Sequence, residues 1–186
     1  MGGPAARAHA PGAGGPRPRP GPRARGQGHG FRRAGAHRHN RPVDGIEIST
    51  DPARIDREWL WKALTTGPDV YWAKFRTRAM FDAQLAAAWR LVGAYEAGTG
   101  RMVGFARAAS DGAALAYLAD VYVDPSARGR GLGRAILAAM IDDGPGRDFR
   151  WMLHTDDAHG LYAEFGFAEP DATYMERRPR MPDVRP

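Results

Sequence analysis

The chain has no cysteine among its 186 residues. Disulfide bonds, thiolate metal sites and cysteine nucleophiles are therefore excluded, and no metal site is indicated. The chain also lacks any run of 18 apolar residues, so we expect no transmembrane helix. Its N-terminal part has no apolar stretch of the kind found in secretory signals. From these absences we expect a cytoplasmic protein with no membrane partner.

Lysine is scarce, and acidic residues are missing from the first 42 positions. Lys62 and Lys74 stand against 25 arginines. Residues 1–42 hold nine arginines and no acid, whereas residues 43–186 hold 18 basic and 21 acidic residues, a net charge of −3. The overall net charge of +6 thus comes from the N-terminal segment. The remainder gives no support to a nucleic-acid partner, which a basic chain would otherwise suggest.

Residues 1–42 consist largely of glycine, proline, arginine, alanine and histidine. Phe31 is the only large apolar residue between Met1 and Val43. Such a segment buries too little surface to offset its chain entropy, so we expect it to be disordered. It could be a polycationic arm for nucleic acid or another polyanion, or an extension without function. The lack of further aromatic residues and of a repeat favours the second interpretation.

A folded domain is expected over residues 43–186, where apolar residues recur at helix and strand spacings. The predicted order β-α-α-β-β-β-α-β-α-β indicates a mixed α/β sheet and not an alternating, doubly wound one. The predicted elements are a strand at 45–49, helices at 52–64 and 72–86, strands at 89–96, 101–109 and 114–123, a helix at 131–142, a strand at 150–154, a helix at 157–165 and a strand at 173–177.

A glycine-rich turn, residues 128–133, lies between an apolar strand at 118–123 and a strongly helical run at 134–140. Backbone N–H groups at a helix start lack partners, and the helix dipole is positive there. Glycines remove Cβ atoms, so a phosphate can approach these amides closely. Arg128, Arg130 and Arg134 add positive charge. The turn is therefore a candidate site for a diphosphate.

Three kinds of phosphate-binding turn are candidates for this segment. The nucleoside triphosphate loop ends in Gly-Lys-Ser/Thr, which is absent here. In the dinucleotide fingerprint the third glycine is spaced differently, and the flanking chain alternates strands and helices. The coenzyme A pyrophosphate pattern, Arg/Gln-x-x-Gly-x-Gly/Ala, is matched in full by Arg128-Gly129-Arg130-Gly131-Leu132-Gly133. An ordinary glycine-rich turn is also compatible with these six residues.

Two longer segments carry a family resemblance. Residues 120–134, Asp-Val-Tyr-Val-Asp-Pro-Ser-Ala-Arg-Gly-Arg-Gly-Leu-Gly-Arg, resemble the signature segment of the GNAT superfamily of N-acetyltransferases. Residues 157–167, Asp-Ala-His-Gly-Leu-Tyr-Ala-Glu-Phe-Gly-Phe, resemble the next segment of that superfamily, in the right order. The resemblance extends upstream through residues 103–107. It implies the GNAT acyl-CoA N-acyltransferase fold and an acetyl-CoA-dependent transfer to an amine.

The resemblance also implies roles for individual residues. Tyr162 would be the general acid that protonates the departing thiolate, and the amide of Val121 would polarise the thioester carbonyl. Without cysteine or a Gly-x-Ser-x-Gly elbow, direct attack by the amine in a ternary complex is the simplest mechanism. The residues expected to bind acetyl-CoA are Val121, Val123, Arg128, Gly129, Arg130, Gly131, Leu132, Gly133 and Arg134.

The general base is left open. Strand alternation would place Tyr117, Ala119, Val121 and Val123 on one face, and Tyr117 stands where the family often has a glutamate. Asp120 would lie on the opposite face and could instead be structural. His154, at a strand end, has suitable chemistry, and a water-relayed proton would need no dedicated base.

The acceptor pocket is expected between the first two helices. Tyr71, Trp72 and Arg76 are the candidate substrate-binding residues, although aromatic residues at helical spacing are usually core. Asp156 is the expected N-cap of the helix that carries Tyr162. The alternative to an enzyme is a non-catalytic acyl-CoA sensor on the same fold, recruited to a polyanion by the basic segment.

Overall fold

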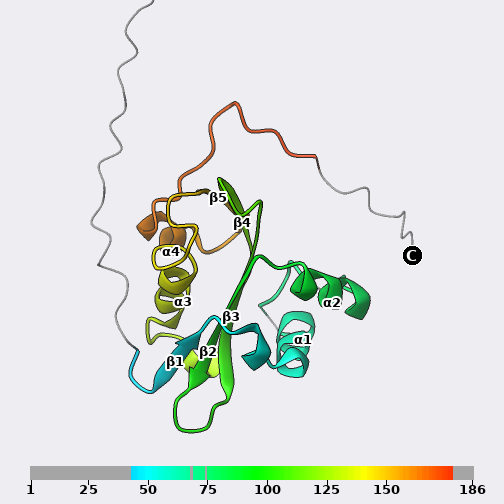
Figure 1. The fold of residues 1–186 in the computed structure, drawn as a ribbon, viewed down its shortest axis with the longest axis vertical. Helices are drawn as coiled ribbons and strands as arrows, with labels where there is room; N and C mark the ends of the chain where they lie inside the picture. Colours follow the sequence, from blue (N-terminus) through cyan, green and yellow to red (C-terminus); the bar gives the residue numbers. More distant parts are fainter. Residues whose placement is uncertain (1–42, 68, 74, 178–186) are drawn as a thin grey trace, which may run out of the picture. The chain divides into compact units, whose positions relative to one another are not determined.

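The computed structural model describes residues 43–67, 69–73 and 75–177. They form one five-stranded sheet in the order β1-β2-β3-β4-β5 (Figure 1). β1 to β4 are antiparallel neighbours, and β5 runs parallel to β4. The predicted disordered segment, 1–42, lies outside the described residues. The strands are β1 (Ile46–Ser49), β2 (Arg90–Glu96), β3 (Met102–Ser110), β4 (Leu115–Val123) and β5 (Arg150–Met152).

Helices cover both faces of this sheet. α1 (Arg57–Thr66) and α2 (Arg78–Ala86) lie on one side, and α3 (Leu132–Met140) and α4 (His159–Glu164) on the other (Figure 1). Each face therefore has its own apolar core. The first centres on residues of α1, α2 and β3, and the second on residues of α3 packed against β2, β3 and β4. None of the helices in the described ranges is long and apolar enough to cross a membrane.

The mixed α/β sheet and the element order through α4 agree with the prediction, but two helices begin later than predicted and the last strand is absent from the described residues. The helix predicted at 52–64 is a 3₁₀ turn at Pro52–Arg54 followed by α1, because Asp51 and Asp56 each cap a separate start. The helix predicted at 72–86 begins at Arg78, capped by Thr77. The strand predicted at 173–177 is wrong: the described residues there form no strand.

A β-bulge interrupts β4 at its centre. Arg107 of β3 pairs with Asp120, whereas the next residue, Ala108, pairs with Leu118, so Ala119 is the extra residue. The bulge puts Leu118 and Val121 in the same core cluster, on the α3 side. The prediction that Tyr117 shares a face with Val121 by simple alternation is therefore wrong, because one inserted residue inverts the alternation.

The pairing of β4 with β5 is short. Only Leu115–Tyr117 and Arg150–Met152 are in register, and β4 then continues to Val123 with no described strand beside it on that edge. The two parallel strands thus diverge after Tyr117. The divergence leaves backbone groups of β4 open at the edge where β5 ends.

α3 lies very close to the sheet. A Cβ atom on Gly104 of β3 would come within 2.6 Å of Ile136 Cδ1. Ile136, Leu137 and Met140 have no exposed surface. This packing places the N-terminus of α3, and with it the glycine-rich turn, next to the end of β4.

A buried carboxylate joins the other face of β4 to the segment between α1 and α2. Asp120 is 2% exposed and accepts hydrogen bonds from Trp72 Nε1 (3.0 Å), from both terminal nitrogens of Arg76 (2.8 and 3.3 Å) and from Arg107 Nε (2.8 Å). Burial alone would raise the pKa of Asp120, but the hydrogen bond from Arg76 and the charges of Arg107 and Arg76 outweigh it and lower that pKa. The carboxylate therefore stays ionised and anchors the segment before α2.

We predict that Asp120→Ala lowers the free energy of unfolding by about 3–5 kcal/mol, because Arg76 and Arg107 would remain nearly buried without a counter-charge. Urea denaturation of the two proteins measures the difference. Asp82→Ala is the matched control, since Asp82 is an exposed carboxylate that also pairs with two arginines.

The same anchor predicts a pH dependence of stability. The folded-state pKa of Asp120 is lowered. Its contribution to the free energy of unfolding is therefore complete above a pH of about 3.9, the ordinary pKa of aspartate. It is lost as the pH falls through the folded-state pKa. If Asp120→Ala and Asp82→Ala lowered the free energy of unfolding by the same amount, Asp120 would not be the anchor.

Candidate functional site

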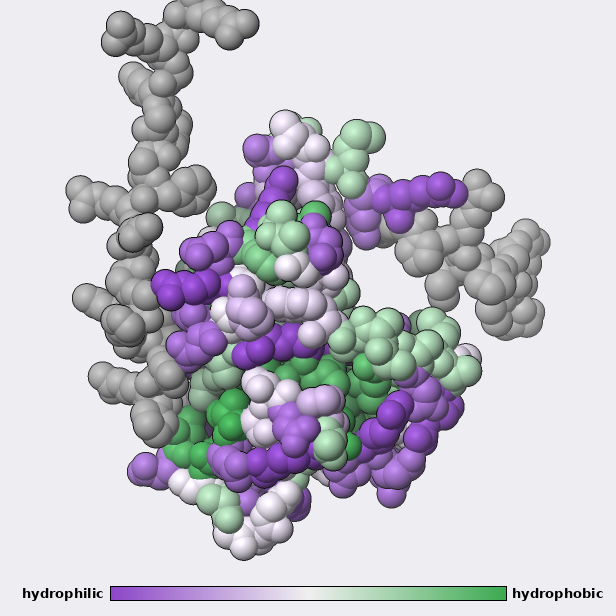
Figure 2. Space-filling model, viewed as in Figure 1, coloured by the Kyte–Doolittle hydropathy of each residue, from purple (hydrophilic) through white to green (hydrophobic). Residues whose placement is uncertain are grey.

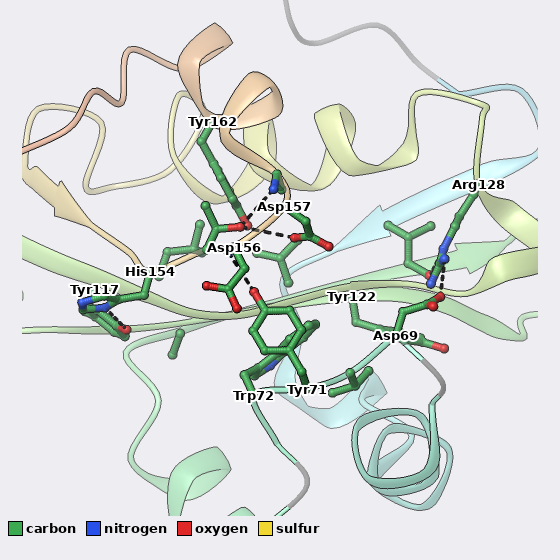
Figure 3. A pocket seen from close by; sticks show the side chains of 17 residues that line it. Asp69, Tyr71, Trp72, Tyr117, Tyr122, Arg128, His154, Asp156, Asp157 and Tyr162 are labelled. Atoms are coloured by element: carbon green, nitrogen blue, oxygen red, sulfur yellow. Dashed lines mark hydrogen bonds and ion pairs between the residues drawn. The ribbon is translucent and has the colours of Figure 1, made fainter. Parts of the chain in front are cut away.

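A cavity of about 300 Å³ opens where β4 and β5 diverge. Four parts of the chain enclose it (Figure 3): β4 forms its floor, α4 and the loop before it cover one side, and the segment between α1 and α2 covers the other. The described residues that line it are Asp69, Val70, Tyr71, Trp72, Tyr117, Leu118, Ala119, Val121, Tyr122, Val123, Arg128, His154, Thr155, Asp156, Asp157, Ala158 and Tyr162.

The glycine-rich turn at one end of this cavity has the backbone that phosphate binding requires. Gly129 and Gly131 have φ angles of +74° and +81°, which favour glycine strongly. Gly131 is the N-cap of α3 and makes no side-chain capping bond. The first N–H groups of any α-helix have no intrahelical partner, and in α3 the N-cap side chain does not supply one. A Cβ atom at Gly129 or Gly131 would meet no atom within 4 Å, so the turn is open on that side.

The three arginines in and directly after the turn have protein partners. Arg128 pairs with Asp69 at 2.7 Å and donates to the Val123 carbonyl, and Arg130 donates to the carbonyl of Asp44. Arg134 forms two 2.6 Å hydrogen bonds with Glu164 of α4. These contacts hold the turn in place. Asp69 and Glu164, the partners of Arg128 and Arg134, offset part of the positive charge predicted there.

Val121 and Val123 present backbone groups to the open edge of β4. The N–H of Asp124 donates to Val103 in β3. Successive residues of a strand direct these groups to opposite edges, so those of Val123 and Val121 point away from β3. The hydrogen bond from Arg128 Nε to the Val123 carbonyl lies on that same open side.

Tyr162 projects from α4 toward the cavity (Figure 3). Burial, followed by the charges of Asp157 and Tyr71, raises the pKa of Tyr162 to about 12. Its ring packs edge-on against Phe167 at 5.8 Å. The phenol is therefore held in a defined position and remains a proton donor at neutral pH.

The three expected acceptor residues separate into two roles. Tyr71 and Trp72 line the cavity, where they are about 40% exposed. Arg76 does not line it, because its guanidinium is occupied by Asp120. The Tyr71 hydroxyl accepts a hydrogen bond from the Asp156 N–H at 2.9 Å, which connects the two sides of the cavity.

One side of the cavity is acidic, which was not predicted from the sequence. The prediction that Asp156 caps the Tyr162 helix is wrong, because α4 begins after Ala158, whose N–H donates to Thr155 Oγ1. Asp156 and Asp157 instead line the cavity. Their position directly before this helix was a signal, but only the fold places them opposite Tyr71.

Within the described ranges, no three His, Asp or Glu side chains lie close enough together to hold a metal ion. The groups available for binding a ligand are the amides at the start of α3, the open edge of β4 and the polar side chains of the cavity. This arrangement suits a long ligand with an anionic part at the turn and a reactive part near Tyr162.

Comparison with known proteins relates this arrangement to one family. The family model described as acetyltransferase (GNAT) family matches residues 57–167. Among curated proteins, serotonin N-acetyltransferase 2, chloroplastic, from Oryza sativa subsp. japonica is 43% identical over 76 residues, which are 39% of this chain and 38% of that protein. Glucosamine 6-phosphate N-acetyltransferase 1 from the same plant is 31% identical over 124 residues, 59% of this chain and 72% of that protein. The chain thus spans well under half of the first relative's length.

Solved structures agree on the fold. A crystal structure described as an acetyltransferase of the GNAT family from Xanthomonas campestris pv. campestris is 35% identical, with a TM-score of 0.66 over 74% of this chain and 95% of that chain. An acetyltransferase structure from Deinococcus radiodurans R1, 22% identical with a TM-score of 0.54 over 74% of this chain and 92% of that chain, shows similarity of fold alone.

Proposed function

The chain belongs to the acetyltransferase (GNAT) family, and on this basis we propose that it transfers the acetyl group of acetyl-CoA to an amine by direct attack in a ternary complex. The observation that carries this proposal is a convergence at one cavity. Arg128 at the start of the glycine-rich turn, the open edge of β4 and Tyr162 all line it, and the turn, the edge and the phenol each meet a different requirement of acetyl transfer.

The turn and β4 fit the two ends of acetyl-CoA. Gly129 and Gly131 leave the amides at the start of α3 open, and these amides can bind the pyrophosphate. The outward backbone groups of Val121 and the N–H of Val123 can pair with the pantetheine arm, as an added strand would, whereas the Val123 carbonyl already accepts from Arg128. We therefore retain residues 128–134, Val121 and Val123 as the proposed acetyl-CoA site.

The transfer needs stabilisation of an oxyanion and a proton for the leaving thiolate. When the amine nitrogen bonds to the carbonyl carbon, the Val121 N–H would donate to the resulting oxyanion. As the C–S bond then breaks, the Tyr162 hydroxyl would protonate the sulfur. The raised pKa of Tyr162 means that the phenol holds its proton at neutral pH, so a proton is present beside the sulfur when the thiolate departs.

The charge of the cavity favours a cationic acceptor. Asp156 and Asp157 are carboxylates, and the rings of Tyr71, Trp72 and Tyr122 can contact an apolar body or an ammonium group. Among the described residues of the lining, Arg128 is the only arginine or lysine, and Asp69 already pairs with it. We infer that the acceptor is an ammonium-bearing molecule with an aromatic or apolar part.

The names of the two curated relatives offer a chemical contrast. Serotonin is an amine attached to an aromatic ring, whereas glucosamine 6-phosphate carries a phosphate dianion. A buried phosphate needs cationic partners, and the described lining offers a net negative charge instead. The lining therefore supports an acceptor chemically closer to serotonin.

A charge reversal at the turn tests acetyl-CoA binding. We predict that Gly131→Glu abolishes the rise in melting temperature that acetyl-CoA causes, because a carboxylate would repel the pyrophosphate at the start of α3. Gly131→Lys is the matched control, since it imposes the same strain at a φ of +81° but should retain part of the rise. A full rise with Gly131→Glu would refute the turn as the binding site.

Removal of one oxygen tests Tyr162. We predict that Tyr162→Phe lowers kcat by about 10²-fold and leaves the melting-temperature rise with acetyl-CoA nearly unchanged, because only the proton donor is lost. Free thiol release over an amine panel measures the rate. An unchanged rate and pH profile would show that Tyr162 is not the acid. A wild-type chain that binds acetyl-CoA but acetylates no amine would be a sensor and not an enzyme.

Matched amines test the acceptor class. We predict that 2-phenylethylamine and serotonin give kcat/KM values at least about 10-fold above that of glucosamine 6-phosphate, and that glucosamine without its phosphate exceeds the phosphorylated sugar. Asp156→Asn should lower kcat/KM for the cationic amines, whereas Asp143→Asn, outside the cavity lining, should not. Preference for the phosphorylated sugar would reject this class of acceptor.

A further inference from the structure

A hydrogen-bonded pair lies at the end of the cavity opposite Arg128. Tyr117 is the last β4 residue that pairs with β5, and His154 follows β5 by two residues. The Tyr117 hydroxyl and His154 Nδ1 are 2.9 Å apart, and both side chains line the cavity (Figure 3). A phenol and an imidazole joined by a hydrogen bond thus line the same cavity as Val121 and Tyr162.

The second nitrogen of the imidazole faces a carboxylate. His154 Nε2 lies 3.7 Å from Glu176 Oε1, and the Tyr174 ring packs 6.5 Å from the imidazole. A carboxylate beside Nε2 favours the tautomer that carries its proton there. Nδ1 is then an acceptor, so Tyr117 donates its hydroxyl proton to His154.

The alternative carboxylate on the strand is unsuited to accept a proton. Asp120 accepts hydrogen bonds from Trp72, Arg76 and Arg107, and its side chain is only 1% exposed. All its partners are donors, so a proton added to it would displace one of them. His154 is half exposed, and its imidazole can exchange protons with water.

Resting on the acetyl transfer proposed above, we propose that Tyr117 and His154 form the route by which the acceptor amine loses its proton. The N–H bond of the attacking amine breaks and its proton passes to the Tyr117 oxygen, while the Tyr117 proton passes to His154 Nδ1. The N–H bond of the amine is thereby replaced by an N–H bond at His154 Nδ1, and Tyr117 is again a neutral phenol. The imidazolium faces Glu176 and returns its proton to water on its exposed side.

The burial of Tyr117 favours a proton relay over a mechanism in which Tyr117 is deprotonated and acts as the base itself. Burial is the main cause that raises the pKa of Tyr117, followed by Tyr174 and Glu176. A phenolate would therefore be costly, whereas simultaneous transfer to His154 avoids it. The titratable and charged groups around the pair are Asp120 and Arg107 behind Tyr117, Tyr174 and Glu176 on the C-terminal side, and Asp156, Asp157, Tyr71 and Tyr162 around the cavity.

The relay is tested with His154→Gln, Tyr117→Phe and the double variant, all in the full-length protein with acetyl-CoA and the best amine of the panel. Glutamine still accepts a hydrogen bond from Tyr117 but takes no proton near neutral pH. We expect each single variant to lower kcat/KM by about 10²-fold at pH 7, with acetyl-CoA binding unchanged. The double variant should lose little more, because the two side chains act as one unit.

The pH profile separates a proton relay from a structural role. In the wild type, kcat/KM should fall as the pH is lowered, because an imidazole that already carries both protons accepts no further one. His154→Gln should lack this decline, and its deficit should shrink at high pH as hydroxide takes over. His159→Gln, a histidine of α4 outside the cavity lining, should behave as the wild type in every assay.

Several outcomes would overturn the relay. Additive losses in the double variant, an unchanged rate or pH profile with His154→Gln, or an imidazole ¹⁵N spectrum with the proton on Nδ1 would each do so. An active wild type with an unaffected His154→Gln rejects the relay alone. A wild type that acetylates no amine rejects the proposed function and the relay together.

Discussion

The arrangement of the cavity depends on the buried carboxylate of Asp120. Its hydrogen bonds from Trp72, Arg76 and Arg107 join β4 to the chain segment before α2. Val70 and Ala73 of this segment are buried, but Tyr71, Trp72 and Phe75 are substantially exposed, so the ion cluster adds to a small apolar contact. Hydrophobic residues remain on the surface over α2 (Figure 2). The anchor and the buried side chains of Val70 and Ala73 together hold the segment as one wall of the cavity.

The bulge at Ala119 decides which side chains face that anchor and which face α3. Asp120 and Arg107 pair across β3 and β4, while Val121 packs in the α3 cluster. The face of β4 toward α1 and α2 therefore carries the Asp120 ion cluster. The open backbone edge of β4 lies between this face and the face that packs against α3. Divergence from β5 after Tyr117 exposes this edge at the point where the proposed proton donor, Tyr162, and the proposed relay, Tyr117 with His154, approach from different elements.

Local patterns predicted much of the site because the features concerned are themselves local. Positive-φ glycines at the start of a helix, residues 128–133, can be inferred from a short segment. The helix that carries Tyr162 was predicted for the same reason, although its start was misplaced. Predictions failed where contacts distant in sequence override local preference: residues 72–76 look helical, but Asp120 binds Trp72 and Arg76 from 48 and 44 positions away.

The sequence by itself determined the family resemblance, the order of strands and helices through α4, and the turn proposed to bind acetyl-CoA, since each rests on short-range spacing and residue type. Only the tertiary structure decided which side chains meet. It joined Tyr117 to His154, 37 positions away, and Tyr71 to Asp156, 85 positions away. It also took Arg76 out of the acceptor pocket. The physical reason is that such meetings depend on loop paths and on a one-residue shift in strand register, and neither is encoded in the periodicity of a single segment.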